Sequence, residues 1–293
     1  ELCDQLASTD SRIRVFHKPN TGVSDTRNHG LDMASGEYVI FLDADDYWVE
    51  NSVLKTFLDF AEKYCVDLVR GDYISVTEEG KIISLENFHD SNLANKPIKS
   101  IDFVENIIHG EYFTPLTLFR RQTIGTLRFN EKRIFLEDME FYSRLIVKGC
   151  KCAYLPITFY AYRKHSQSIS SQINLRKIRD SFTMSEVFAE CSNSTEDFEL
   201  RGYYNYSAAM MYYWTLESLV DGDNFKFYKK NKKTIDLSSA QPKIKTIAHN
   251  NYSKPLSPLI FIPPYICVWI MRIKYLLMNF AVKIKRVILS KNI

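Results

Sequence analysis

The sequence predicts an α/β fold, in which a mixed, mostly parallel sheet with flanking helices is followed by a C-terminal helical region. Two observations predict it. Between residues 13 and 163, short apolar runs typical of strands alternate with helical patterns, and after Gln172 the strand patterns stop. The run Glu37–Leu42 is almost continuously apolar, which is typical of a strand buried on both faces of a parallel sheet.

The first half of the sheet is expected between residues 13 and 85. Lys18–Gly22 supplies turn residues before a helix, and apolar residues recur at helical spacing between Asn51 and Lys63. The expected elements are a strand at 13–16, a helix at 23–34, a strand at 37–42, a helix at 51–63, a strand at 66–70 and short strands within 73–85.

The second half of the sheet is expected between residues 101 and 163. Glu137 and Asp138 mark the start of one helix and Gly149 marks its end, as capping preferences predict, while Pro156 divides the last apolar run into two strands. The expected elements are a helix at 101–108, a strand at 117–120, a helix at 138–148, strands at 152–155 and 158–163, and helices at 175–191, 196–220 and 225–233.

These elements suggest three parts: an α/β domain at 1–171, a helical region at 172–254 and a tail at 255–293. With 45% hydrophobic and 25% charged residues, the chain is globular rather than fibrous or disordered. Six cysteines without paired spacing are expected to be reduced, buried thiols, and no secretory signal peptide is recognisable, so the expected compartment is the cytoplasm.

The tail is strongly basic. Residues 237–293 contain nine Lys or Arg and no Asp or Glu, which favours an anionic partner, and a membrane surface fits better than nucleic acid. From Tyr265 onward the sequence predicts an apolar helix that Arg272 and Lys274 make too polar to span a bilayer, so we expect an interfacial helix. Its polar stripe comprises Arg272, Asn279, Lys283, Arg286 and Ser290. The alternative is a helix packed on the body of the protein.

Three acids follow the predicted strand at 37–42. Asp43, Asp45 and Asp46 would repel one another unless a cation neutralised them, and carboxylate oxygens suit Mg²⁺ or Mn²⁺ bridging to substrate phosphates. The alternative is a solvated turn that caps the next helix. Ligands of open α/β sheets bind outside the carboxyl ends of the strands, which favours the metal.

Four motifs, in the same order, resemble the inverting family 2 glycosyltransferases of the GT-A fold, which is a Rossmann-like architecture. They lie at Lys18–Gly30, Gly36–Asp46, Leu136–Phe141 and Tyr162–Ser170. The resemblance covers residues 1–171. It implies that the chain moves a sugar from a nucleotide diphosphate to an acceptor hydroxyl with inversion.

The resemblance also implies residue roles. Asp45 is the expected ligand of Mn²⁺ or Mg²⁺, and Asp43 is expected near the ribose or the metal's water shell. Arg27 would face the nucleotide diphosphate, where a fixed positive charge stabilises phosphate oxygens. Asp138 is the expected catalytic base, although acids at a helix start are also common for capping alone.

Two further residues of the last motif complete the expected site. His165 corresponds to a histidine that closes the metal site in many relatives, and Ser168 is expected to hydrogen-bond donor phosphate. A lone histidine is more often an ordinary surface or core residue, so the ligand role competes with that alternative.

The setting implied by the resemblance is cell-surface polysaccharide synthesis. The expected donor is a UDP-sugar, the acceptor is a glycan or lipid-linked saccharide, and the enzyme is peripheral on the inner face of the cell membrane. Relatives begin with a strand and an Asp-Asp-Gly-Ser motif that contact the nucleotide, and neither is present here. The alternatives are therefore a truncated, inactive binding protein or a sugar-phosphate nucleotidyltransferase, against which Glu137, Asp138 and His165 argue.

Overall fold

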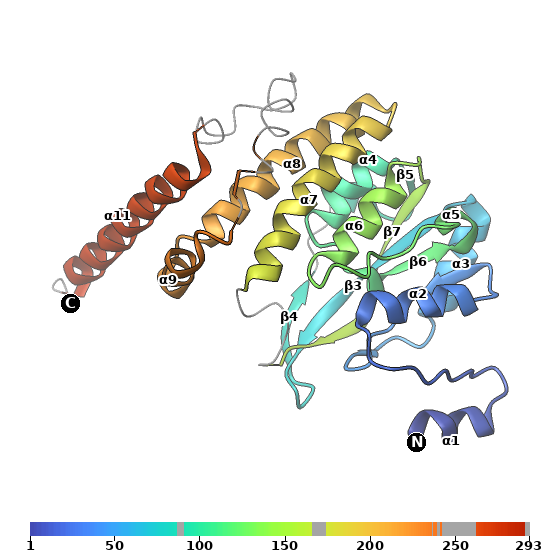
Figure 1. Cartoon of the computed structure of the whole chain (residues 1–293). Helices are drawn as coiled ribbons and strands as arrows, with labels where there is room; N and C mark the ends of the chain where they lie inside the picture. Colours follow the sequence, from blue (N-terminus) through green and yellow to red (C-terminus); the bar gives the residue numbers. More distant parts are fainter. Residues whose placement is uncertain (87–90, 166–173, 236, 239–240, 242–261, 291–293) are drawn as a thin grey trace.

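The computed structural model in Figure 1 describes residues 1–293 except 87–90, 166–173, 236, 239–240, 242–261 and 291–293. The strands are β1 (Tyr38–Ile40), β2 (Tyr47–Trp48), β3 (Leu68–Val76), β4 (Ile82–Glu86), β5 (Pro97–Ile98), β6 (Thr117–Arg120) and β7 (Cys152–Arg163). The α-helices are α1 (Leu2–Thr9), α2 (Val23–Met33), α3 (Val53–Tyr64), α4 (Ser100–Asp102), α5 (Arg121–Ile124), α6 (Glu137–Ile146), α7 (Leu175–Ser194), α8 (Phe198–Ser218), α9 (Gly222–Asn231) and α11 (Pro264–Ser290). Shorter turns are the 3-10 helices η1 (Ser91–Leu93) and η3 (Thr114–Leu116) and the π-helix η2 (Phe103–Ile108).

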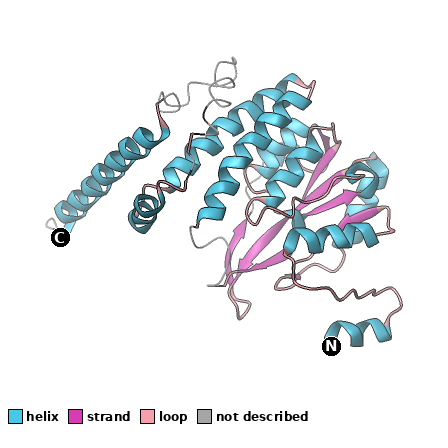
Figure 2. Ribbon diagram, in the orientation of Figure 1, coloured by secondary structure: helices cyan, strands magenta, loops and turns pink. Residues whose placement is uncertain are grey.

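The seven strands form one mixed sheet with helices on both faces, as Figure 2 shows. The strand order is β1-β6-β3-β7-β2, with β4 beside β3 and β5 beside β7. Among the described strands only β3 and β7 pair in parallel, so the prediction of a mostly parallel sheet is wrong. The physical reason is an insertion: β1 and β3 run in the same direction, but β6 lies between them and is antiparallel to both.

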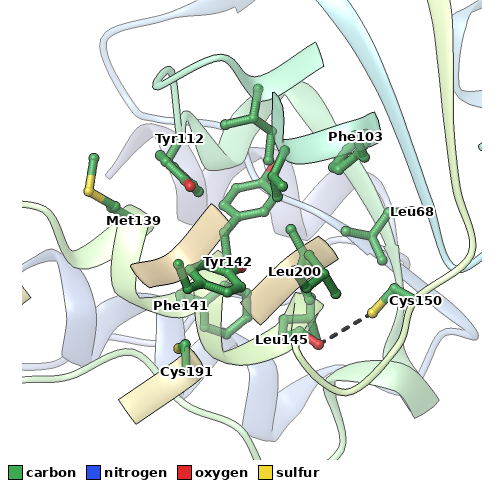
Figure 3. Packing of buried hydrophobic residues seen from close by; sticks show 14 of the residues in the cluster. Leu68, Phe103, Tyr112, Met139, Phe141, Tyr142, Leu145, Cys150, Cys191 and Leu200 are labelled. Atoms are coloured by element: carbon green, nitrogen blue, oxygen red, sulfur yellow. Dashed lines mark hydrogen bonds between the residues drawn. The ribbon is translucent and has the colours of Figure 1, made fainter. Parts of the chain in front are cut away.

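Two apolar cores cover the two faces of the sheet, because neighbouring residues of a strand point to opposite sides. Leu68 and Phe119 face one core, whereas Val69 and Leu118 face the other. The first core is filled from η2, α6, α7 and α8, and Figure 3 shows part of it, including the bond from the Cys150 thiol to the Leu145 carbonyl. The second core is covered by α3.

Strand β7 is continuous, so the predicted division at Pro156 is wrong. Between Tyr154 and Thr158 its pairing with β3 shifts register, and the exposed proline lies in this bulge, where its missing N–H leaves no ladder bond unmade. Opposite the bulge, a Cβ on Gly71 would lie 2.8 Å from the Phe57 ring. Only glycine therefore fits at that position of β3.

Most predicted helices lie within a few residues of their expected bounds, and three other expectations need correction. The segment 13–16 has no regular structure, and Ile13 and Phe16 are exposed. The helix expected at 101–108 is a short α-helix that continues as the π-helix η2. All six cysteines are free, as expected, but Cys3 and Cys65 are exposed rather than buried.

The C-terminal helices enclose a separate apolar cluster between α7, α8, α9 and the start of α11. Tyr212 and Leu216 of α8 pack there with Phe225 of α9 and with Val268 and Met271 of α11. None of the helices in the described part of the chain combines the length and apolar character that crossing a bilayer requires.

Candidate active site

Arg27 lies at the centre of the candidate site. It is on the buried side of α2, which begins after Gly22, and only 9% of the Arg27 side chain is exposed. One terminal nitrogen donates to the Asp138 carboxylate and lies 3.6 Å from Glu137 Oε1, and the other donates to Asp43 Oδ1 at 3.1 Å. Arg27 therefore joins three elements: α2, the segment after β1, and the first turn of α6.

The guanidinium is held over aromatic rings. Its central carbon lies 5.4 Å from the centroid of the Phe129 ring and 6.0 Å from that of Phe41. These cation–π contacts fix the position of the charge without consuming its hydrogen-bond donors. Burial would lower the pKa of Arg27, but the carboxylates of Asp138, Asp43 and Glu137 more than offset this and raise it, so the group stays positive.

Asp138 is buried at the start of α6. Its Oδ2 accepts the backbone N–H of Thr114 at 3.0 Å, while Oδ1 accepts from Arg27. Burial raises the pKa of Asp138 despite these two donors, and burial together with the Asp138 charge raises the pKa of Glu137. A buried carboxyl with a raised pKa is a candidate for proton transfer. Leu136 is the residue directly before α6, and its left-handed φ of 64° turns the chain into the helix.

The acidic turn after β1 is tied to β7 by a hydroxyl. Tyr160 donates to Asp46 Oδ2 at 2.6 Å and accepts the backbone N–H of Asp43 at 3.3 Å. The other Asp46 oxygen accepts the backbone N–H of Arg163 at 2.8 Å. These bonds hold the acidic turn against the end of β7, two residues before His165.

Asp45 and His165 are brought together by this connection. His165 Nε2 lies 2.9 Å from Asp45 Oδ2, and 52% of the Asp45 side chain and 34% of the His165 side chain are exposed. Adjacent ligands in an octahedron with bonds of about 2.1 Å are about 3 Å apart, so the pair has the spacing and donor types of two metal ligands. Within the described residues no third His, Cys, Asp or Glu completes such a group. A metal here would need further oxygens from water or phosphate.

The structure thus gathers the expected site residues into two adjoining groups. Arg27, Asp43 and Asp138 form one, and Asp45 with His165 forms the other. Ser168 lies outside the described residues, so its proposed role stays a prediction. Tyr160 was not predicted as a site residue, because its only signal in the sequence is its place in an apolar strand next to the last motif.

Comparison with known proteins supports the resemblance. The model of glycosyl transferase family 2 matches residues 1–127. The cholesterol galactosyltransferase of Borreliella burgdorferi is 28% identical over 232 residues, covering 72% of this chain and 63% of that protein. Glycosyltransferase GlyG of Streptococcus pneumoniae serotype 4 is 27% identical over 198 residues, covering 65% of this chain and 64% of GlyG. The chain therefore spans just under two thirds of these relatives.

A solved structure matches the fold over most of the chain. Residues 1–349 of S. aureus TarS, in a complex with UDP, superpose with a TM-score of 0.57 at 13% sequence identity. The match covers 94% of this chain and 76% of the TarS chain. At this identity the likeness concerns the fold, and it confirms the predicted GT-A architecture.

Proposed function

We propose that the chain, whose residues 1–127 match the model of glycosyl transferase family 2, transfers a sugar, with inversion, from a nucleotide diphosphate to an acceptor hydroxyl. The observation that carries the proposal is the contact of Asp138 with Arg27, next to the pair of Asp45 and His165. A buried base, a fixed cation and a metal-ligand pair are the groups that this reaction requires.

Asp138 is the proposed base. It takes the proton of the acceptor hydroxyl while that oxygen attacks the anomeric carbon on the side opposite the departing diphosphate. The charge of Arg27 opposes the effect of burial on Asp138, although burial remains the stronger of the two and the pKa of this carboxyl is raised. The Thr114 N–H fixes the second oxygen, so the carboxylate cannot rotate freely. One base is sufficient, because the diphosphate leaves as an anion and needs no proton.

Arg27 is the proposed cation for that leaving group. In the structure its guanidinium serves Asp138, Asp43 and Glu137, which together carry more negative charge than it can neutralise. Donor phosphates would compete for the same terminal nitrogens. We propose that Asp43 lies near the ribose or the metal's water shell and that Ser168 contacts phosphate.

Asp45 and His165 are the proposed protein ligands of Mn²⁺ or Mg²⁺. Such a metal supplies charge stabilisation to the diphosphate. The role of this chain's own residues is to hold the two ligands 2.9 Å apart, through the Tyr160 and Asp46 bonds described above.

The proposed donor is a UDP-sugar, and the acceptor is a glycan or lipid-linked saccharide of a cell-surface polysaccharide. Two observations support this choice: TarS was crystallised with UDP and with UDP-GlcNAc, and a relative is named as a cholesterol galactosyltransferase, which takes a lipid acceptor.

The test is a donor screen with the full chain, with and without Mn²⁺, and with Asp138→Asn in parallel. We expect release of one nucleoside diphosphate in the presence of metal, and its loss in the variant. Full turnover by Asp138→Asn would remove the proposed base, and metal-independent turnover would remove the role of Asp45. Binding of nucleotide without any transfer would favour an inactive binding protein instead.

A further inference from the structure

Helix α11 has two faces that differ in what they contact. Cys267, Val268 and Met271 are buried against α8 and α9, and Arg272 donates to the Val220 carbonyl at 2.5 Å. The Arg272 guanidinium also lies 4.8 Å from the centroid of the Phe225 ring. Arg272 is therefore an anchor to the body of the protein, and not the outward-facing start of a polar stripe that the sequence predicted.

The opposite face of α11 is apolar and exposed. At about 100° per residue its members fall within an arc of roughly 120°, so they form one continuous strip along about three turns. We call this strip the outer face; its residues are Ile270, Ile273, Leu276, Leu277 and Phe280. Single exposed apolar residues are common on soluble proteins, but a continuous strip of this kind marks a contact surface. Figure 1 shows α11 at the margin of the molecule, beside α8 and α9.

The charge around the strip identifies its partner. Lys274 is exposed and borders the outer face, and Lys283, Lys285 and Arg286 follow in the same helix. No Asp or Glu occurs anywhere from residue 237 to the end of the sequence. A folded protein partner or a second copy would have to accept the unbalanced positive charge of this part of the sequence, whereas anionic headgroups supply the opposite charge uniformly.

We propose that the outer face of α11 lies in the surface of an anionic membrane, at the level of the headgroups, while its inner face holds the catalytic part through α8 and α9. Trp269 lies at the edge of the outer face: its ring packs edge-on against Phe225 of α9, with ring centroids 5.0 Å apart, and 48% of it is exposed. Tryptophan is enriched at the headgroup level of membranes, which suits this partly exposed position. The proposal does not depend on the proposed reaction: it concerns where the chain lies, and its test needs no turnover.

The test is flotation of the full chain with lipid vesicles. The variant combines Leu276→Gln, Leu277→Gln and Phe280→Gln, at side chains that are 50%, 63% and 64% exposed. These changes keep helix propensity and net charge, and they leave the docked face intact. We expect the chain to float with vesicles of phosphatidylcholine and phosphatidylglycerol, and the partition coefficient of the variant to fall by about a hundredfold.

The chain offers a matched control on β4. Ile82, Ile83 and Leu85 are 64%, 50% and 63% exposed, so changing all three to Gln removes a similar exposed apolar area elsewhere. This control should float like the unchanged chain. Lys274→Gln should weaken binding about fivefold to the anionic vesicles only, and added salt should weaken it further.

Three outcomes would overturn the proposal. They are equal flotation of the α11 variant and the unchanged chain, equal loss in the β4 control, and absence of vesicle binding together with a change of oligomeric state in the α11 variant. The last result would assign the outer face to a second copy of the chain. Circular dichroism of each variant checks that α11 remains helical.

Discussion

Two carboxylates on α6, Asp138 and Glu140, each contact a buried arginine, but they differ in which force dominates. At Asp138 burial dominates and the pKa is raised. At Glu140 burial also acts, but Arg133, Arg144 and Asn130 outweigh it, and the pKa is lowered. Two residues of helix therefore separate a carboxylate that favours the proton from one that favours the charge.

The difference follows from how the two arginines are shared. Arg133 uses all three nitrogens, donating to Glu140, to the Asp180 carbonyl and to the Thr183 hydroxyl. Arg27 divides two nitrogens among three carboxylates, and its Nε has no partner within the described part of the chain. A saturated network of hydrogen bonds stabilises a fold, whereas the unsaturated network around Arg27 retains capacity for a ligand.

The largest expected effect comes from removing the charge of Asp138 in the unsaturated network around Arg27. Asp138→Asn should lower kcat by about a thousandfold, since a positioned base contributes roughly 10²–10⁴. Stability should change little, because an ionised group is unfavourable where burial raises its pKa, and Arg27 keeps Asp43 and Glu137. Steady-state kinetics and a urea unfolding curve measure both quantities. A large loss of stability with kcat retained would contradict the assignment of the Arg27 network to function rather than to stability.

In the saturated network around Arg133, a substitution should lower stability more than activity. Glu140→Gln leaves the Arg133 charge buried with no carboxylate beside it, and Arg133 is only 3% exposed. Breaking such a pair costs about 3–5 kcal/mol. We expect this loss in the free energy of unfolding from urea titration, with kcat of the folded fraction changed far less than in Asp138→Asn. A cost below about 1 kcal/mol would show that the network is not structural.

A substitution of Tyr160 tests whether the acidic turn needs its hydrogen bonds to β7. Tyr160→Phe removes a hydroxyl that makes two hydrogen bonds, which we expect to cost about 1–2 kcal/mol. It should also raise the metal concentration needed for half-maximal rate, because Asp45 and His165 lose their fixed spacing.

Tyr212→Phe is the matched control for Tyr160→Phe. Tyr212 is equally buried, and its hydroxyl has no hydrogen-bond partner among the described residues. This variant should leave both stability and metal dependence unchanged. If both tyrosine variants shift the metal dependence alike, the Tyr160 hydroxyl is not a positioning group.

The smallest expected effect is on pH dependence. Because the pKa of Asp138 is raised in the folded protein, the folded protein holds this proton up to a higher pH than the unfolded chain does. The stabilisation from the protonated form is therefore present below the unfolded pKa and is lost as pH rises through the folded pKa. Glu140 has the opposite sign: its stabilisation is present above its unfolded pKa and is lost as pH falls through its lowered folded pKa.

For catalysis, the acid limb of the kcat/KM profile should lie above the ordinary range of an aspartate. In Arg27→Lys a single amine replaces the two terminal nitrogens that donate to Asp138 and to Asp43, so Asp138 loses part of its stabilising charge and this limb should move to still higher pH. An acid limb that stays in place would show that a group other than Asp138 titrates.

The sequence was informative where chemistry requires a short motif. Asp43, Asp45 and Asp46 lie within four residues, and Asp138 begins a helix, so their grouping could be predicted. The sheet was harder, because no local pattern shows that β6 is inserted between β1 and β3. The Tyr160 tie could not be predicted either, since its partners are distant in sequence and a tyrosine in an apolar strand is usually core. The same limit applies to Arg133, whose pairing with Glu140 depends on the fold of the preceding loop.

Strand β7 has a consequence for how the chain folds. It pairs with β2, β3 and β5, and it carries the residues that close the site. Tyr160 and Asp46 are 114 residues apart in sequence. Contacts of such long range form slowly, because the entropy of closing the intervening loop is lost before they are made. During synthesis the acidic turn therefore leaves the ribosome well before its partners, and the site can assemble only after His165 has emerged.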